Sequence, residues 1–425
     1  MKNSKIKYLP IVLISIFLIF ISTNLISKNI NEFYDPARDS LSYLSLAESI
    51  DKHNKFERLE YLGQGTETIR TPLYPLLLSL FINNLKAIIL IQSLLHVCSS
   101  LILLHMVKKI TSQFVSVFVF FLFLFNPVLV SISQLLITES ISIFLLSTSI
   151  YVLVEKNNKF MFCLICGILP LVRPAFIVVA FGFLIFMKVF NKDLSLKKFI
   201  VLSLLLILPS LGWTIRNYLQ TDMFIFSSLS SMNLLEETAS GIMSINEDFE
   251  GGETIFEIIN IEYEERRKWS QILRNEVNLG DLSRVIANAP GPNPHIVTSE
   301  YQKYALNVIK DNKIELVVLG SRSLIYVLFE PGDHLVEYVF KVDNLTLYRY
   351  VFTFLNLFII LLSYKNIIQS TFNNKKIDTL ILFYLLLLTP LLLLSTPHAR
   401  FGSILIFFHL LFFSKEVSKK PYFQR

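Results

Sequence analysis

Charged residues are scarce in this chain. Only 17% of its 425 residues are charged and 53% are hydrophobic, whereas a soluble domain carries about 25% charged residues. The apolar residues fall in blocks long enough to cross the roughly 30 Å of hydrocarbon in a bilayer. The composition argues against an ordinary soluble domain and predicts an integral membrane protein with an all-α polytopic fold.

Sequence patterns typical of several other functions are missing. No basic tract interleaved with aromatic residues lies in a polar segment, so the net charge of +6 does not indicate a nucleic-acid partner. No HExxH motif, paired CxxC motifs or clustered His and Asp side chains occur in the outer-face segments, so no metal cofactor is expected. The Gly63-Gln64-Gly65 triplet lacks the strand–helix context of a phosphate loop and is interpreted as a turn.

Cysteines are few as well. The chain has 3 of them, and all lie in apolar runs. Cys163 and Cys166 have the spacing of a redox motif, but no βαβ pattern lies beside them. We interpret these two as packing residues, and no disulfide framework is expected.

What the chain has in quantity is apolar segments of transmembrane length. About ten spans are predicted, at residues 8–27, 87–107, 112–130, 138–154, 160–172, 174–190, 198–213, 347–364, 377–394 and 399–414. The first is interpreted as an uncleaved span, because no small-residue cleavage site follows it before Tyr34. A tight turn is predicted at Arg173-Pro174, since proline cannot continue the preceding helix.

Lysines give the predicted orientation. They gather in the connections on one side, together with the N-terminus, whereas the short connections on the other side hold only Arg173 and Arg400. By the positive-inside rule, both termini are expected in the cytoplasm of an inner (plasma) membrane. Residues 314–330 are apolar too, but counting them as a span would break this charge pattern. They are predicted to form an amphipathic helix in the interface.

This topology divides the chain into three regions. Residues 1–213 would form a first transmembrane region, with amphipathic helices in an outer loop at residues 28–86. Residues 214–346 would form a larger periplasmic loop of about 130 residues, which includes the interfacial helix. Residues 347–425 would form the C-terminal transmembrane region.

Acidic residues stand directly after the first predicted span, in the stretch YDPARDSLSYLSLAESI. Asp39 is followed at helical spacing by Tyr43, Ala47 and Ile50, which predicts a helix lying on the bilayer surface. A carboxylate at the start of a helix is most often an N-cap, and Asp35 before a proline suits turn chemistry. On this stretch alone, both structural interpretations stay open.

The same loop ends in ETIRTPLYPLLLSLF, where Arg70, Pro72 and Tyr74 lead into a second predicted amphipathic helix. An acid followed at intervals of four by Tyr and Ala, and then Arg-x-Pro-x-Tyr-Pro, resembles the GT-C glycosyltransferases. The resemblance is to the branch of protein O-mannosyltransferases and lipid A aminoarabinose transferases (glycosyltransferase family 39-like). Further matches follow in the family's order, at Thr138–Ser140, Leu171–Pro174, Trp213–Tyr218 and His398–Phe401.

The resemblance implies a GT-C-like helix arrangement and a specific reaction. A sugar would pass, with inversion, from a polyprenyl-phosphate donor to a lipid, glycan or protein of the cell envelope, on the outer face. Asp39 would be the general base and Asp35 its substitute. The chain departs from the family at Ser40, where a second acid is common.

The remaining residues of the implied site fall into two groups. Guanidinium and imidazole groups suit phosphate oxygens, so the donor phosphate would be bound by Arg70, Arg400, Arg216 and His398. The substrate would be lined by Tyr43, Tyr74, Glu139 and Arg173.

Each of these residues also has a structural interpretation. The arginines would be snorkelling anchors, and the tyrosines would be anchors at the membrane interface. Glu139 and Arg173 could pair with each other, because ionisable groups near span ends are costly unless paired or functional. Some members of the resembled family use a divalent ion, so an Asp35/Asp39 metal site stays an alternative.

Two other functions compete with a transferase. A transporter or flippase for a lipid-linked saccharide would place polar or charged residues near the middle of its spans, at broken helices. Here ionisable residues gather at the outer ends of the predicted spans, which favours chemistry at the outer interface. A catalytically inactive scaffold in an envelope-assembly complex is the third alternative.

Overall fold

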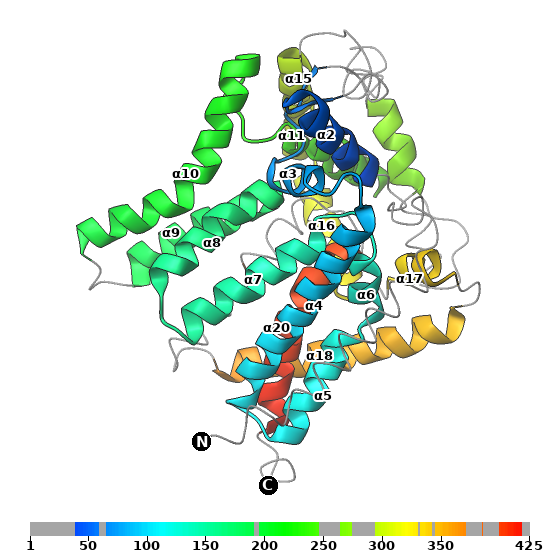
Figure 1. The fold of residues 1–425 in the computed structure, drawn as a ribbon. Coiled ribbons are helices and arrows are strands. Elements are labelled where there is room, and N and C mark those ends of the chain that lie inside the picture. The colour runs from blue at the N-terminus through cyan, green and yellow to red at the C-terminus, as the bar shows by residue number, and fades with distance from the viewer. Residues whose placement is uncertain are drawn as a thin grey trace.

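The fold is almost entirely helical (Figure 1). The structure is a computed structural model, and it describes residues 39–58, 65–190, 195–245, 264–273, 294–329, 332–341, 345–370, 385 and 399–418. Within these ranges the single sheet is a two-stranded antiparallel ladder that joins β1 (Glu57–Arg58) to β2 (Gly65–Thr66). The prediction of an all-α membrane protein is confirmed, with this short ladder as an addition.

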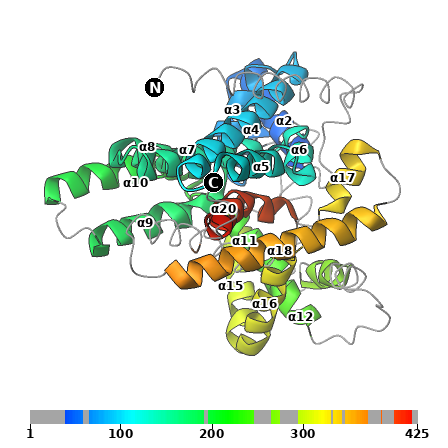
Figure 2. The same ribbon diagram turned by 90° about the horizontal axis from the view of Figure 1, so that it is seen from below.

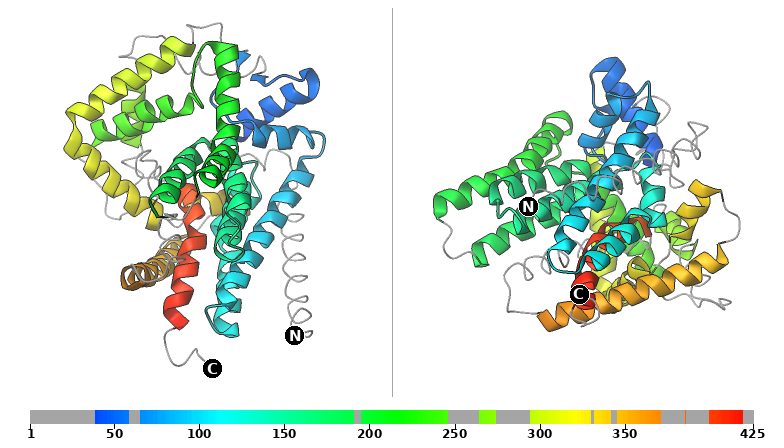
Figure 3. Two further views of the ribbon diagram at one scale, coloured as in Figure 1. Left: turned by 90° about the vertical axis from the view of Figure 1, so that its left-hand side faces the viewer. Right: turned by 60° about the horizontal axis from the view of Figure 1, so that its bottom comes forward.

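The helices lie in two layers (Figures 1 and 3). The lower layer contains apolar helices, which are α4 (Leu85–Lys108), α5 (Gln113–Leu124), α7 (Glu139–Val154), α8 (Lys159–Val172), α9 (Ile177–Phe190), α18 (Thr346–Ser370) and α20 (Ala399–Ser418). The upper layer contains, among others, α2 (Asp39–His53), α3 (Leu73–Ser79), α11 (Leu229–Asn233) and α15 (Pro294–Asp311). Helix α10 (Leu196–Thr221) connects the two layers.

The other elements are connections and short helices. They are α6 (Pro127–Ser133), the 3-10 turn η4 (Pro174–Phe176), the π-helix η5 (Leu234–Ala239), α12 (Ser240–Ser244), α16 (Lys313–Phe329) and α17 (Asp333–Phe340). Helix α16 covers the segment predicted to lie in the interface and is helical as expected. Its placement at the interface stays a prediction.

Predicted spans that fall on described residues are helical, whereas the span at 8–27 and all but residue 385 of the span at 377–394 lie outside those residues. Helices α4, α10 and α18 are long and apolar enough to cross a membrane, and α5 with α6 passes the same test as one bent pair. Helices α7, α8 and α9 are apolar but shorter. The number of ten spans therefore stays a prediction.

Two predicted boundaries are corrected. The span at 112–130 is broken by a 50° bend between α5 and α6, because Pro127 starts a new helix and the Asn126 side chain accepts a hydrogen bond from the backbone N–H of Leu129, 3.2 Å away. The span predicted to end at residue 213 continues to Thr221, where Asp222 adopts a left-handed conformation. The helix therefore extends about two turns beyond the predicted end of the span, and the start of the outer loop stays a prediction.

Helix α20 forms the centre of the core. It passes between α5 and α18, as the view from below shows (Figure 2), and it contacts α4 and α7 as well. Leu405, Phe407 and Phe408 on α20 are completely or almost completely buried. Cys163 and Cys166 belong to the same hydrophobic cluster as free thiols, which confirms the packing interpretation for this pair.

Helices α8 and α10 approach each other closely at a glycine. A Cβ atom added to Gly167 would lie 2.2 Å from the backbone carbonyl oxygen of Leu205. We predict that Gly167→Ala lowers the thermal unfolding midpoint of the detergent-solubilised protein, with a loss of roughly 1–3 kcal/mol, because backbone atoms must move to accept the methyl group.

Gly212 in α10 provides the matched control, since a Cβ atom added there meets nothing within 4 Å. Gly212→Ala should leave the midpoint unchanged or raise it, because alanine favours helix by about 1 kcal/mol over glycine. Equal midpoints for the two variants would show that the α8–α10 contact is looser than described.

Candidate active site

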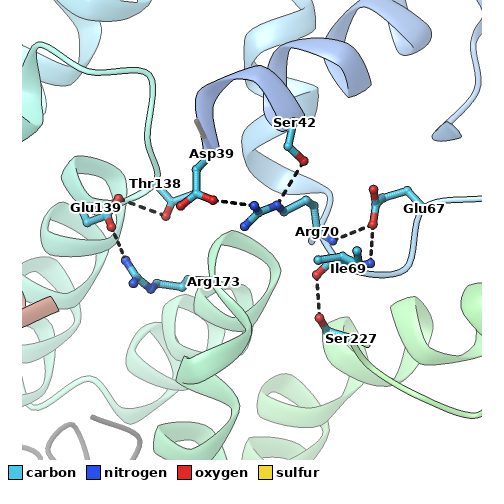
Figure 4. Close-up of polar contacts among 9 residues, drawn as sticks. All are labelled: Asp39, Ser42, Glu67, Ile69, Arg70, Thr138, Glu139, Arg173 and Ser227. Carbon is cyan, nitrogen blue, oxygen red and sulfur yellow. Dashed lines mark hydrogen bonds and ion pairs between the residues drawn. The ribbon is translucent and has the colours of Figure 1, made fainter. Parts of the chain in front are cut away.

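Asp39 and Arg70 form an ion pair in the upper layer (Figure 4). Asp39 is the first residue of α2, where a negative charge is favoured by the helix dipole. Its Oδ1 atom accepts a hydrogen bond of 2.6 Å from Nη2 of Arg70. Both side chains stay partly exposed, at 21% for Asp39 and 17% for Arg70. A ligand from outside can therefore reach this pair.

The guanidinium of Arg70 is held on several sides. Its Nε atom donates to Oγ of Ser42, 3.2 Å away. The central guanidinium carbon, Cζ, lies 5.0 Å from the ring centroid of Tyr43, within the range of a cation–π contact. Burial is the largest single influence and acts to lower the pKa of Arg70, but Asp39, Tyr43 and Glu67 together outweigh it and the pKa is raised. The third nitrogen, Nη1, has no hydrogen-bond partner among the described residues and is available to an anion.

A second ion pair lies beside the first. Glu139 opens α7, and Arg173 follows the end of α8. Nη1 of Arg173 donates to Oε1 of Glu139 at 2.6 Å, and the hydroxyl of Thr138 contacts the other carboxylate oxygen at 3.4 Å. The interpretation that Glu139 and Arg173 pair with each other is confirmed. So is the tight turn, because Pro174 starts η4 directly after an extended Arg173.

The two pairs belong to one site. In Figure 4 the carboxylate of Asp39 is drawn between the guanidinium of Arg70 and the Glu139–Arg173 pair. Burial is the largest cause of the raised pKa of Tyr43, and the charges of all four residues in the two pairs also influence that pKa. Tyr43 is thus a neutral group near four charged ones, and it cannot serve as a base near neutral pH.

The tyrosines lie beneath the charges rather than at an exposed interface. Tyr43 is 8% exposed and Tyr74 is fully buried, and their rings meet edge to face at 5.0 Å. The hydroxyl of Tyr74 donates to Oε1 of Gln92 at 2.7 Å. The side-chain amide of Gln92 in turn donates to the backbone carbonyl of Leu135 at 2.7 Å. Their interpretation as interface anchors does not hold, because anchoring side chains need exposed surface.

Arg216 holds a loop and is only partly available to a phosphate. Its guanidinium donates to the backbone carbonyls of Glu67, at 2.7 Å, and Phe56, at 2.9 Å. The same group lies 4.8 Å from the ring centroid of Trp213 and 5.3 Å from that of Phe56. These contacts join α10 to the ends of the β1–β2 hairpin.

Three residues named from the sequence cannot be placed in the site. Asp35 and His398 lie outside the described residues. Arg400 is the second residue of α20, but its side chain is not among those described. Among the described residues, no group of three or more His, Cys, Asp or Glu side chains could hold a metal ion.

Sequence reasoning missed two residues that support the site. Glu67 has no exposed surface, and its Oε1 atom accepts hydrogen bonds from the backbone N–H groups of Ile69 and of Arg70, the latter at 3.0 Å. Gln92 connects α3 to the end of α6 through Tyr74. A glutamate three residues before Arg70 and a glutamine in an apolar helix were the available signals.

Comparisons with known proteins add little. No family model and no curated protein matches the chain. Among solved structures, the crystal structure of ArnT from Cupriavidus metallidurans in the apo state is similar at a TM-score of 0.38 and 10% sequence identity, over 97% of this chain and 77% of that chain. A likeness this weak carries no argument, so the site assignment depends on the geometry.

The burial of Glu139 leads to a test of the second ion pair. Glu139 is only 2% exposed, so Arg173→Ala would leave a buried carboxylate without its guanidinium. We predict a destabilisation of roughly 3–5 kcal/mol, because breaking a buried pair costs far more than breaking an exposed one. Thermal unfolding of the purified protein measures it.

Lys109 and Glu155 provide the control, since they form an ion pair in which the lysine is 49% exposed. Lys109→Ala should change stability by at most about 1 kcal/mol. If Arg173→Ala were as mild as Lys109→Ala, Glu139 would have to be satisfied by other groups, and its dependence on Arg173 would be refuted.

Proposed function

We propose that the protein is a membrane glycosyltransferase that moves a sugar from a polyprenyl-phosphate donor to a lipid, glycan or protein acceptor of the cell envelope. The observation that carries the proposal is the Asp39–Arg70 pair. It combines a reachable carboxylate with a guanidinium that keeps a free donor, next to the apolar layer. The sequence resemblance to GT-C enzymes points to the same two residues.

The chemistry follows from the two groups. Asp39 would take the proton of an acceptor hydroxyl as the oxygen attacks the anomeric carbon of the sugar. The bond from that carbon to the phosphate oxygen would break, and its electron pair would stay on the polyprenyl phosphate. Attack from the face opposite the phosphate gives inversion of configuration.

Charge that develops on the leaving phosphate needs fixed cations. Arg70 would provide one through Nη1, which points to no described protein group. Arg173, which is 13% exposed, would face the same space from the other side of Asp39. His398 and Arg400 keep their assignment to the donor phosphate on the basis of the sequence alone.

Donor binding would also free the base. One oxygen of Asp39 is engaged by Nη2 of Arg70 at 2.6 Å, and a phosphate bound at Nη1 would draw on the same positive charge and weaken that bond. A carboxylate released in this way is a stronger acceptor for a hydroxyl proton. The donor would then bind before the acceptor is activated.

The proposed location follows from the charges in the connections. The lysine-rich connections would be cytoplasmic, with both termini, and the ion pairs would lie on the outer face. The site-bearing region would end at Thr221, because α10 continues past the boundary expected at residue 213.

A transporter of lipid-linked saccharides is the second candidate, and the break between α5 and α6 favours it. Some polar groups near this break are hydrogen-bonded within the protein, although Oγ of Ser131 and Oε1 of Gln134 are buried without a hydrogen-bond partner among the described residues. Nε2 of His96 lies 3.0 Å from the backbone carbonyl oxygen of Leu124, and the side-chain amide of Gln134 donates to Oγ of Ser93 at 3.1 Å. The break thus has a structural explanation, and the transferase is preferred.

The deciding experiment is a transfer assay with the protein in nanodiscs, a panel of radiolabelled polyprenyl-phosphate sugars and an envelope extract as acceptor. Asp39→Asn should lower the transfer rate about 100-fold or more, because it removes the proposed general base while keeping a side chain that can still contact Arg70.

Asp51→Asn is the control, since Asp51 is an exposed residue near the other end of α2. It should transfer at the wild-type rate. Normal transfer by Asp39→Asn would end the assignment of the base, and label that moves across the membrane without reaching an acceptor would support the transporter instead.

A further inference from the structure

The backbone from Glu67 to Ile69 is fixed at every carbonyl. The carbonyl of Glu67 accepts a bond from Arg216 at 2.7 Å, that of Thr68 accepts from the backbone N–H of Ser228 at 3.0 Å, and that of Ile69 accepts from the hydroxyl of Ser227 at 2.6 Å. All three donors come from α10 or from the connection between α10 and α11. The segment that leads into Arg70 is therefore attached to a part of the chain far away in the sequence.

The amide side of the same segment is fixed by one carboxylate. Oε1 of Glu67 receives the backbone N–H groups of both Ile69 and Arg70, which closes a turn directly before the Arg70 side chain leaves the backbone. Glu67 has no exposed surface. A buried carboxylate is costly unless it is hydrogen-bonded. The two bonds to Oε1 of Glu67 offset part of that cost, and interactions of its second oxygen and of its charge add to them.

The charge of Glu67 also matters to the arginine. An uncharged side chain such as asparagine closes comparable turns without burying a carboxylate. The carboxylate adds a negative potential at Arg70, and it is one of the charges that raise the pKa of that residue. Glu67 thus acts on Arg70 both through the backbone and through space.

We propose that Glu67 is a positioning residue, which sets the direction of the Arg70 guanidinium toward Asp39 and toward the phosphate of a lipid-linked substrate. The inference depends on the proposed function, because it assigns a donor-binding role to Arg70. Glu67 itself touches no reacting atom. Its loss should weaken the binding of the phosphate much more than it slows transfer at saturating donor.

A double-mutant cycle tests the inference. The probe is a polyprenyl phosphate without sugar, and its Kd is measured on the full chain in nanodiscs for wild type, Glu67→Ala, Arg70→Gln and the double variant. Glu67→Ala should raise the Kd about tenfold or more, and it should add nothing in the Arg70→Gln background, since a positioning residue acts only through its partner.

Two further variants separate positioning from general damage. Glu67→Gln keeps an oxygen that accepts both N–H groups and should restore most of the affinity lost in Glu67→Ala. The control is Glu57→Gln in the same hairpin. Glu57 is 38% exposed and its carboxylate lies 3.7 Å from Nζ of Lys55, and this variant should bind like wild type. Amide hydrogen exchange at Ile69 and Arg70 should become faster in Glu67→Ala.

The outcomes are distinct. Wild-type affinity in Glu67→Ala, or an equal loss of affinity with and without Arg70, would overturn the role of Glu67 and leave the proposed function intact. Wild-type protein that binds no polyprenyl phosphate and transfers no sugar would overturn the proposed function, and the positioning role would fall with it.

Discussion

The site depends on one constraint, which is that an ionised side chain beside a bilayer must have a partner. Ionisable groups in this setting are rare and are normally paired or functional. Here two acids and two arginines satisfy each other as Asp39–Arg70 and Glu139–Arg173. Each pair joins segments that are separate in the sequence, so the pairing requirement also determines how α2, the hairpin loop, α7 and α8 come together.

Below the charges, buried neutral polar groups also have hydrogen-bond partners. The hydroxyl of Tyr74 is buried and needs an acceptor, which Gln92 supplies from α4. Gln92 uses its amide to satisfy the carbonyls of Ser133 and Leu135 at the end of α6, where helical carbonyls lack partners within the helix. The segment that leads to Glu139 is thereby fixed against α4, and the upper ion pairs rest on a satisfied polar network within an apolar core.

The sequence predicted what depends on local pattern and failed where distant backbone groups decide. Apolar runs predicted the helices, and the cost of charges near span ends predicted the Glu139–Arg173 pair, because both follow from composition along the chain. The role of Arg216 could not be predicted in this way. Its partners are the carbonyls of Glu67 and Phe56, and a carbonyl group has no sequence signature. The buried position of Glu67 depends on the same contacts.

The different exposure of the two acids in the ion pairs separates their roles. The carboxylate of Glu139 is 2% exposed, whereas that of Asp39 is 21% exposed. A group without accessible surface cannot take a proton from a bound hydroxyl. Of the two acids in these ion pairs, only Asp39 therefore meets the geometric requirement of a general base. Glu139 instead holds Arg173 in place by a short charge-assisted bond. The sequence assigned Asp39 to the base, Arg70 to the donor phosphate, and Glu139 with Arg173 to the substrate lining. Burial separates the two acids, because it leaves Asp39 reachable and Glu139 enclosed.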